Sequence, residues 1–133
     1  MSWERVHAVL DYYDGPRLGV ADFRGKPHAF RSVFDVVAQD WSPEYLLKPL
    51  TGDEFETVMK DWAIWLRWLS AYRSGSTSIE THPALPVDAV EHLELSERVA
   101  TAMAIVSDSA ITAAAHFRGN FTSGEMTVQW TTR

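Results

Sequence analysis

The sequence predicts an α+β fold, an antiparallel sheet of five or six strands with two helices packed on one face, from three observations. Residues 3–36 alternate apolar and polar types with a period of two, as in strands with one buried face. Residues 111–131 repeat this alternation. Between them, over residues 52–73, apolar residues recur every three or four positions, as in an amphipathic helix.

Residues 3–36 predict a three-stranded meander, because Asp14-Gly15 and Gly25-Lys26 are typical of tight turns. With two residues in each loop, the cross-strand pairs are His7–Asp22, Val9–Val20, Asp11–Leu18, Ala21–Phe30 and Phe23–His28. The core face then carries Val6, Ala8, Ala21, Phe23, Phe30 and Phe34. The opposite face carries His7, Asp11, Asp22 and Arg31.

The middle of the chain predicts a loop followed by a helix. Residues 37–50 contain two prolines, so we expect a loop with at most a short edge strand at residues 45–47. Thr51 and Glu54 then form a capping box, which opens a helix that runs to about Arg73 and ends at Gly75. Its inward stripe comprises Phe55, Val58, Met59, Trp62, Leu66, Leu69 and Tyr72.

The last third of the chain predicts a second helix and a closing hairpin. After a polar connector over residues 74–86, a helix should lie within residues 87–107, with Leu93, Val99, Met103 and Val106 pointing inward. Residues 111–118 and 126–131 predict the two strands of the hairpin. Residues 108–116 are rich in alanine, and they could extend the preceding helix instead. A length of 133 residues suits one α+β domain over residues 1–133.

Composition narrows the classes of function. The net charge of −6 argues against nucleic-acid binding, which draws much of its affinity from Lys and Arg. The absence of cysteine excludes disulfides and thiolate metal sites. The opening residues lack the apolar stretch of a signal peptide, and no segment is apolar for long enough to span a bilayer. We therefore expect a cytoplasmic protein with no membrane segment, and we expect no cofactor.

The densest polar and aromatic group surrounds the first predicted turn. Carboxylates near a histidine can bind a metal or divide acid and base roles. Asp11 and Asp22, however, lie roughly 13 Å apart along the strands, too far to share one ion. We therefore assign no metal site and no catalytic residue. Turn and strand preferences account for most of these residues, and the alternative is a small-ligand site formed by Asp11, Tyr13, Asp14, Arg17, Asp22 and His28.

The opening segment carries a recognisable set of residues. They are Trp3-Glu4-Arg5-Val6-His7, Asp11-Tyr12-Tyr13-Asp14-Gly15-Pro16-Arg17, Gly19-Val20-Ala21-Asp22-Phe23, Gly25 and Pro27-His28. This segment resembles a family of small, uncharacterised bacterial proteins that share a DYYDGPR-type N-terminal hairpin. The resemblance implies a bacterial cytoplasmic protein and implies no activity.

The tryptophan-rich helix is apolar over more than the usual arc, because Ile64, Trp65 and Trp68 lie outside its inward stripe. Such a helix is either deeply buried or meets a partner, and tryptophan is frequent at binding hot spots. Our leading hypothesis is a small binding or accessory protein that engages a protein partner, or a second copy of itself, through these three residues. The alternative function is a small-ligand binder or enzyme that uses the polar face of the N-terminal hairpin.

Overall fold

A computed structural model describes residues 2–132. The chain forms two compact units. One comprises the chain up to Leu50 together with the chain from Met103 on, and the other comprises Thr51–Ala102. The expected single domain over residues 1–133 and the packing of helices on one face of the sheet stay predictions.

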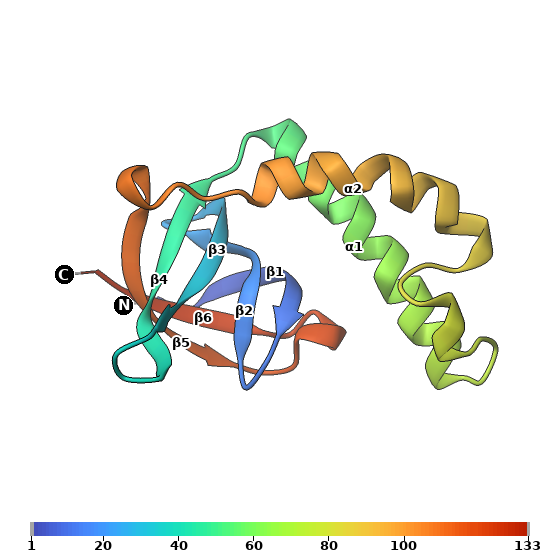
Figure 1. Ribbon diagram of the computed structural model, residues 1–133, viewed down its shortest axis with the longest axis horizontal. Helices are drawn as coiled ribbons and strands as arrows, with labels where there is room; N and C mark the ends of the chain where they lie inside the picture. Colours follow the sequence, from blue (N-terminus) through green and yellow to red (C-terminus); the bar gives the residue numbers. More distant parts are fainter. Residues whose placement is uncertain (1, 133) are drawn as a thin grey trace. The chain divides into compact units, whose positions relative to one another are not determined.

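Across residues 2–132 the chain forms six antiparallel strands and two α-helices, so the α+β class is confirmed. The strands are β1 (Glu4–Tyr12), β2 (Pro16–Phe23), β3 (Lys26–Asp35), β4 (Asp40–Pro49), β5 (Ile111–Arg118) and β6 (Thr127–Thr131). The predicted antiparallel sheet of five or six strands has six, and β6 pairs with β1, so the strands close into a barrel that the sequence did not predict (Figure 1). The seam that closes the barrel consists of the Glu4–Val128 and Arg5–Thr127 pairs.

The first hairpin has a three-residue loop instead of the expected two. Tyr12 pairs with Pro16, so residues 13–15 form the loop, and Asp14 and Gly15 take φ angles of 53° and 124°. The predicted Asp11–Leu18 pair is confirmed. Register shifts farther along the hairpin replace the Val9–Val20 pair by Val9–Gly19 and Ala8–Val20.

The second hairpin turns at Arg24-Gly25, one residue earlier than expected, with φ angles of 53° and 79°. Its pairs are therefore Ala21–His28 and Phe23–Lys26, each two residues from the predicted register. A shift of two residues keeps every side chain on its face. The predicted core residues that are buried are Val6, Ala8, Ala21, Phe23 and Phe30. The prediction for Phe34 is wrong, because it lies beyond a register shift in β3 and is half-exposed.

β4 corrects the expected loop over residues 37–50. It is ten residues long, and it is no edge strand because it pairs with both β3 and β5. Pro43 lies in the irregular stretch between the Ser32–Tyr45 and Phe34–Trp41 pairs, where its missing N–H removes no ladder bond. The alternative left open for residues 108–116 is settled as a strand from Ile111 onward, and the closing hairpin is confirmed.

Aromatic side chains fill the barrel. The rings of Phe30, Tyr45, Phe117 and Trp130 contact one another, with centroid separations between 5.5 and 6.1 Å. Most of these ring pairs meet edge to face or tilted, the arrangements that aromatic quadrupoles favour. The barrel interior is therefore a packed core.

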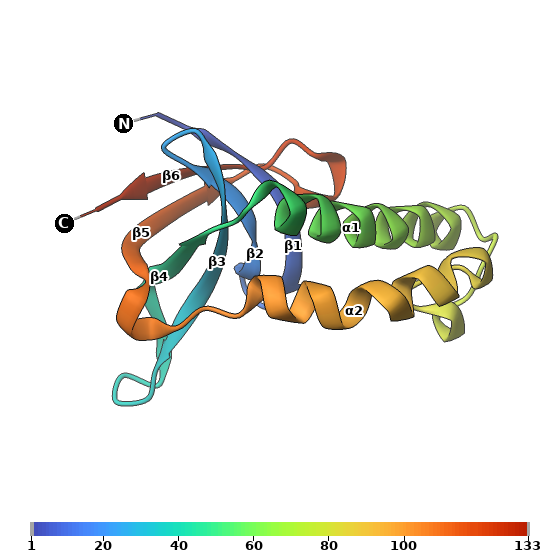
Figure 2. The same ribbon diagram turned by 90° about the horizontal axis from the view of Figure 1, so that it is seen from above.

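The second unit is a helical hairpin of α1 (Gly52–Arg73) and α2 (Ala89–Met103), joined through short 3-10 turns at Ile79–Thr81 and Pro86–Asp88 (Figure 2). The capping box is confirmed: Thr51 Oγ1 accepts from the Glu54 N–H at 3.1 Å, and the Thr51 N–H donates to Glu54 Oε1 at 3.0 Å. Arg67 on α1 donates to both carboxylate oxygens of Asp88 at 3.0 Å, which ties α1 to the 3-10 turn that precedes α2.

The buried face of α2 differs from the prediction. Val99 and Met103 are buried as expected, but Leu93 and Val106 are exposed, and Leu95 is buried instead. Two residues along a helix correspond to about 200° of rotation, so a helix that buries Leu95 turns Leu93 toward solvent. On α1 the inward prediction fails for Tyr72, which is exposed.

Candidate functional site

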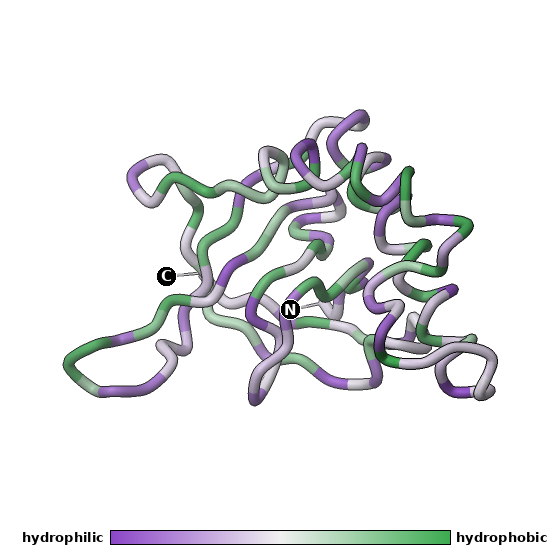
Figure 3. Tube along the Cα trace, turned by 45° about the vertical axis from the view of Figure 1, so that its right-hand side comes forward, coloured by the Kyte–Doolittle hydropathy of each residue, from purple (hydrophilic) through white to green (hydrophobic). Residues whose placement is uncertain are grey.

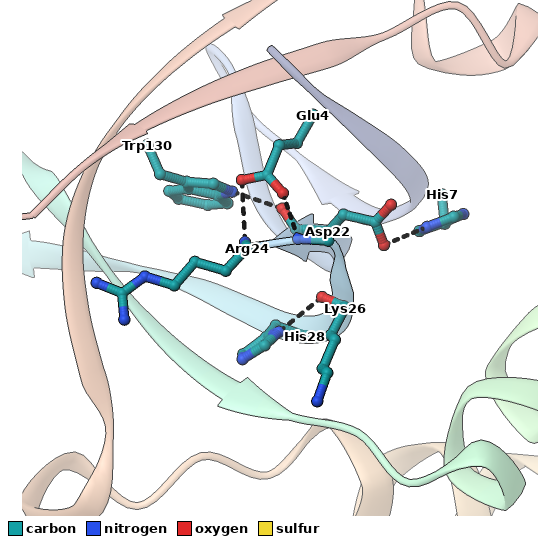
Figure 4. Close-up of polar contacts among 8 residues, drawn as sticks. Glu4, His7, Asp22, Arg24, Lys26, His28 and Trp130 are labelled. Carbon is teal, nitrogen blue, oxygen red and sulfur yellow. Dashed lines mark hydrogen bonds and ion pairs between the residues drawn. The ribbon is translucent and has the colours of Figure 1, made fainter. Parts of the chain in front are cut away.

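The turn between β2 and β3 is held by side chains from the two ends of the chain (Figure 4). The Glu4 carboxylate accepts hydrogen bonds from the N–H groups of Arg24 at 3.1 Å and Gly25 at 2.8 Å. The Trp130 indole N–H donates to the carbonyl oxygen of Asp22 at 2.9 Å. These bonds satisfy turn backbone groups, so the turn is fixed to β1 and β6.

Two predicted ligand-binding residues, Asp22 and His28, lie near this turn. Their side chains are on opposite faces of the paired strands β2 and β3, because His28 pairs with Ala21 and not with Asp22. Asp22 Oδ1 is 2.8 Å from His7 Nε2, which confirms that these two side chains meet despite the shifted register. His28 is buried, with Nδ1 2.8 Å from the carbonyl oxygen of Lys26 and its ring edge-on to Phe23. Each side chain thus has a partner within the fold, and the two do not converge.

A recess of about 420 Å³ opens beside the same turn. Its lining residues are Ser2, Glu4, Phe23, Arg24, Gly25, Trp130 and Thr132. Within the described part of the chain, this lining includes none of the six predicted ligand-binding residues. The Glu4 carboxylate in the lining is already bonded to two turn N–H groups. The recess is therefore distinct from the small-ligand site predicted from the sequence.

The β1–β2 hairpin brings two other predicted residues, Tyr13 and Asp14, against the Arg17 side chain. Arg17 Nε donates to the Tyr13 carbonyl oxygen at 2.7 Å, and Nη2 donates to the Asp14 carbonyl oxygen at 2.6 Å. The guanidinium carbon lies 4.3 Å from the centre of the Trp41 ring, a cation–π contact. Arg17 is buried, whereas Asp11, Tyr13 and Asp14 are exposed. Arg17 therefore holds the turn closed through backbone carbonyl groups.

Tyr45, on β4, contacts the β1–β2 hairpin and was not among the candidate site residues predicted from the sequence. Its hydroxyl donates to the Pro16 carbonyl oxygen at 2.7 Å, and its ring belongs to the barrel core. Burial raises the pKa of Tyr45 above its ordinary value of 10.0, and the positive charge of Arg17 offsets part of the rise. The neutral phenol is thus the form that the fold stabilises.

This raised pKa predicts a loss of stability at alkaline pH. The contribution of Tyr45 is complete below pH 10.0 and is lost as the pH rises through the raised folded-state pKa, because the unfolded chain ionises first. Urea denaturation at a series of pH values should show a steeper alkaline decline for the wild type than for Tyr45→Phe. Equal slopes for the two proteins would contradict the assignment.

The predicted partner-binding residues on α1 are largely withdrawn from solvent. Ile64 and Trp68 are buried, and Trp65 is half-buried and stacked on Trp62 at 4.8 Å. The Trp68 indole N–H donates to Thr81 Oγ1 at 2.9 Å, which fastens the connector between the helices to α1. The wide apolar arc of this helix therefore corresponds mostly to burial.

Apolar side chains are exposed elsewhere in the chain, and two groups of them were not expected from the sequence. One comprises the 3-10 turn before α2 and the first turns of α2, where Val87, Val90 and Leu93 are exposed. The other is the β3–β4 hairpin, where Val36 and Val37 are exposed. Apolar periodicity did not predict either group as exposed. It identifies the apolar positions of a helix or strand, but it does not show which of them a neighbouring element covers.

Among residues 2–132, no three His, Asp or Glu side chains gather closely enough to hold a metal ion. In the same range, no helix has both the length and the apolar character needed to cross a membrane. Comparison with family models, with curated proteins and with solved structures found no match for this chain.

Proposed function

We propose that the protein is a small binding or accessory protein whose partner is another protein, contacted through the α2 strip, which we define as Val87, Val90 and Leu93. One observation carries this proposal: these side chains are 87%, 68% and 72% exposed. Val90 and Leu93 lie three residues apart on one side of α2, and Val87 lies in the 3-10 turn that immediately precedes the helix. Contiguous exposed apolar side chains of this kind are typical of interaction surfaces.

The charge beside the α2 strip favours a particular kind of partner. Glu91 and Glu94 are exposed next to it, and the whole chain carries a net charge of −6. The complementary surface is an apolar groove with Lys or Arg at its rim, into which an amphipathic helix lies with its apolar side down. The same acidic charge disfavours nucleic acid.

The α2 strip replaces Ile64 and Trp68 as the contact surface in our original hypothesis, since those two are buried. A second copy of the chain, giving a homodimer, is the other occupant that the α2 strip would accept. A bacterial, cytoplasmic setting belongs to the same proposal and depends on the resemblance of the opening segment. The alternative of a small-ligand binder or enzyme has less support, because the predicted polar residues do not converge on the recess.

Leu93→Glu is expected to weaken partner binding at least tenfold, because it places a charge in the middle of an apolar contact. Its free energy of unfolding should stay within about 0.5 kcal/mol of the wild type, since the side chain is exposed. Native mass spectrometry of the protein, purified gently from its source cells, identifies the complex. Titration calorimetry with the purified partner then measures the affinity of each variant.

Thr101→Glu is the matched control, because Thr101 is exposed on α2 about two turns beyond Leu93. It introduces the same side chain outside the α2 strip and should leave the affinity unchanged. A complex that binds wild type and Leu93→Glu equally well would reject the proposal. A homodimer that Leu93→Glu dissociates would identify a second copy as the occupant.

A further inference from the structure

The β3–β4 hairpin ends in an apolar turn. Residues 36–39 form the turn, and its first two side chains, Val36 and Val37, are 77% and 96% exposed. Figure 3 shows hydrophobic colouring at the tip of this hairpin, which projects from the barrel strands. Turns are normally built from Gly, Asn, Asp, Ser or Pro, so turn chemistry does not account for two adjacent valines here.

The tip has a defined conformation. Asp35 Oδ1 accepts hydrogen bonds from the Val37 N–H at 3.0 Å and from the Ala38 N–H at 3.1 Å. Asp35 also pairs with Asp40 across the hairpin, which closes the turn. The backbone that carries the two valines is therefore ordered by the chain itself.

The base of the hairpin is braced as well. The rings of Phe34 and Trp41 meet edge to face at 5.1 Å, and Arg17 lies over the Trp41 ring. The backbone of this tip has therefore already lost conformational freedom on folding. Less entropy then remains to be lost on binding, and this favours affinity.

The charged residues of the hairpin segment itself are all acidic, and the Arg17 guanidinium, from β2, lies at its base over Trp41. Residues 32–47 contain Asp35, Asp40 and Glu44 and no Lys or Arg. Such a segment is repelled by anionic lipid surfaces and attracted to basic ones. The complementary surface has an apolar hollow for the valines and positive charge around it.

We propose that residues 35–40, which we call the hairpin tip, form a second protein-binding site. In this site Val36 and Val37 enter an apolar pocket of a partner protein, and Lys or Arg at the rim of that pocket faces Asp40. This site belongs to the barrel unit and is carried by observations independent of the α2 strip. Rejection of the function proposed above would therefore leave the evidence for this second site unchanged.

The first test uses the full chain with the photocrosslinker p-benzoylphenylalanine at position 37, expressed in the source cells. The control carries it at position 123, which is exposed in a different turn of the barrel unit. Position 37 should give a discrete adduct with one protein that position 123 does not give, and the adduct should persist in a Leu93→Glu background. Identical adduct patterns at both positions would overturn the proposal.

The second test measures the chemistry of the contact with the purified adduct partner by calorimetry. Val37→Asp should weaken binding about tenfold without changing thermal unfolding, since the side chain is almost fully exposed. Wild-type affinity should fall as salt is raised, and Asp40→Asn should reduce this dependence. An affinity that is insensitive to Val37→Asp would overturn the proposal.

Two further measurements address other occupants of the tip. Flotation with phosphatidylcholine vesicles, with and without phosphatidylglycerol, should leave the protein unbound. Sedimentation of the purified chain should give the same mass for wild type and Val37→Asp. Vesicle binding that Val37→Asp abolishes would assign the tip to membranes, and self-association that it abolishes would assign the tip to a second copy; either result would overturn the proposal.

Discussion

The Phe30→Ala variant is expected to lose about 4 kcal/mol of unfolding free energy. Phe30 is fully buried, and its ring contacts those of Tyr45, Phe117 and Trp130 in the middle of the barrel. Its removal loses the transfer free energy of the ring and leaves a cavity that three other large rings border. Because these rings come from β4, β5 and β6, the cavity weakens contacts among strands far apart in the sequence.

Chemical denaturation followed by near-ultraviolet circular dichroism measures this loss, since the signal reports the packing of the aromatic rings. Phe34→Ala is the matched control in the same strand, because its ring is half-exposed at the base of the β3–β4 hairpin. The control should lose less than about 1 kcal/mol. Similar losses for the two variants would show that the four-ring cluster is not the centre of the core.

Local sequence patterns predicted every strand except β4, but they did not predict how the strands join. The alternation around Val6 and Ala8 marks a half-buried strand whatever its neighbours are, so β1, β2 and β3 follow from the sequence. Barrel closure depends on Glu4 pairing with Val128, residues at opposite ends of the chain. No local pattern encodes such a pair, because alternation is the same in an open sheet and in a closed one.

Register was predicted only in part, because it depends on details of the loops. The Asp14-Gly15 signal correctly identified a turn, but the Tyr13 N–H bonds to the Gly15 carbonyl oxygen, and the loop takes three residues. In the second hairpin Arg24 adopts positive φ beside Gly25, a conformation that its residue type does not favour. Two hydrogen bonds from the backbone of this turn to Glu4 stabilise it, and these contacts are visible only in the fold.

The candidate site was the hardest part to predict, since residue type does not distinguish a structural role from a functional one. The polar residues of the opening segment illustrate this: Arg17 closes a turn, Glu4 holds the next turn, and His7 contacts Asp22. These roles in folding explain why polar and aromatic residues are dense in the opening segment. They also favour functional surfaces outside it, at the α2 strip and the hairpin tip.

Gly19→Ala is the second variant with a large expected effect, a loss of about 3 kcal/mol of unfolding free energy. A methyl group on Gly19 would overlap the carbonyl oxygen of Ala8 on β1 and would lie 2.7 Å from Cζ of Phe30 on β3. The first neighbour is backbone within a hydrogen-bonded strand, so it cannot turn aside as a flexible side chain can. The second is a buried ring of the core cluster, so the substitution must both separate β1 from β2 at this point and displace Phe30.

Denaturation of Gly19→Ala and of Gly52→Ala compares a crowded glycine with an open one, since a methyl group on Gly52 meets no atom within 4 Å. Gly52→Ala should match the wild type or exceed it by a few tenths of a kcal/mol, because alanine favours the helix that begins there. Adding Phe30→Leu to Gly19→Ala separates the two contacts. The smaller side chain relieves only the ring overlap, so the double variant should lose less unfolding free energy than the sum of the losses of the two single variants.

If Gly19→Ala were as stable as the wild type, β1 and β2 would not approach each other this closely, and the assigned register of the first hairpin would be wrong.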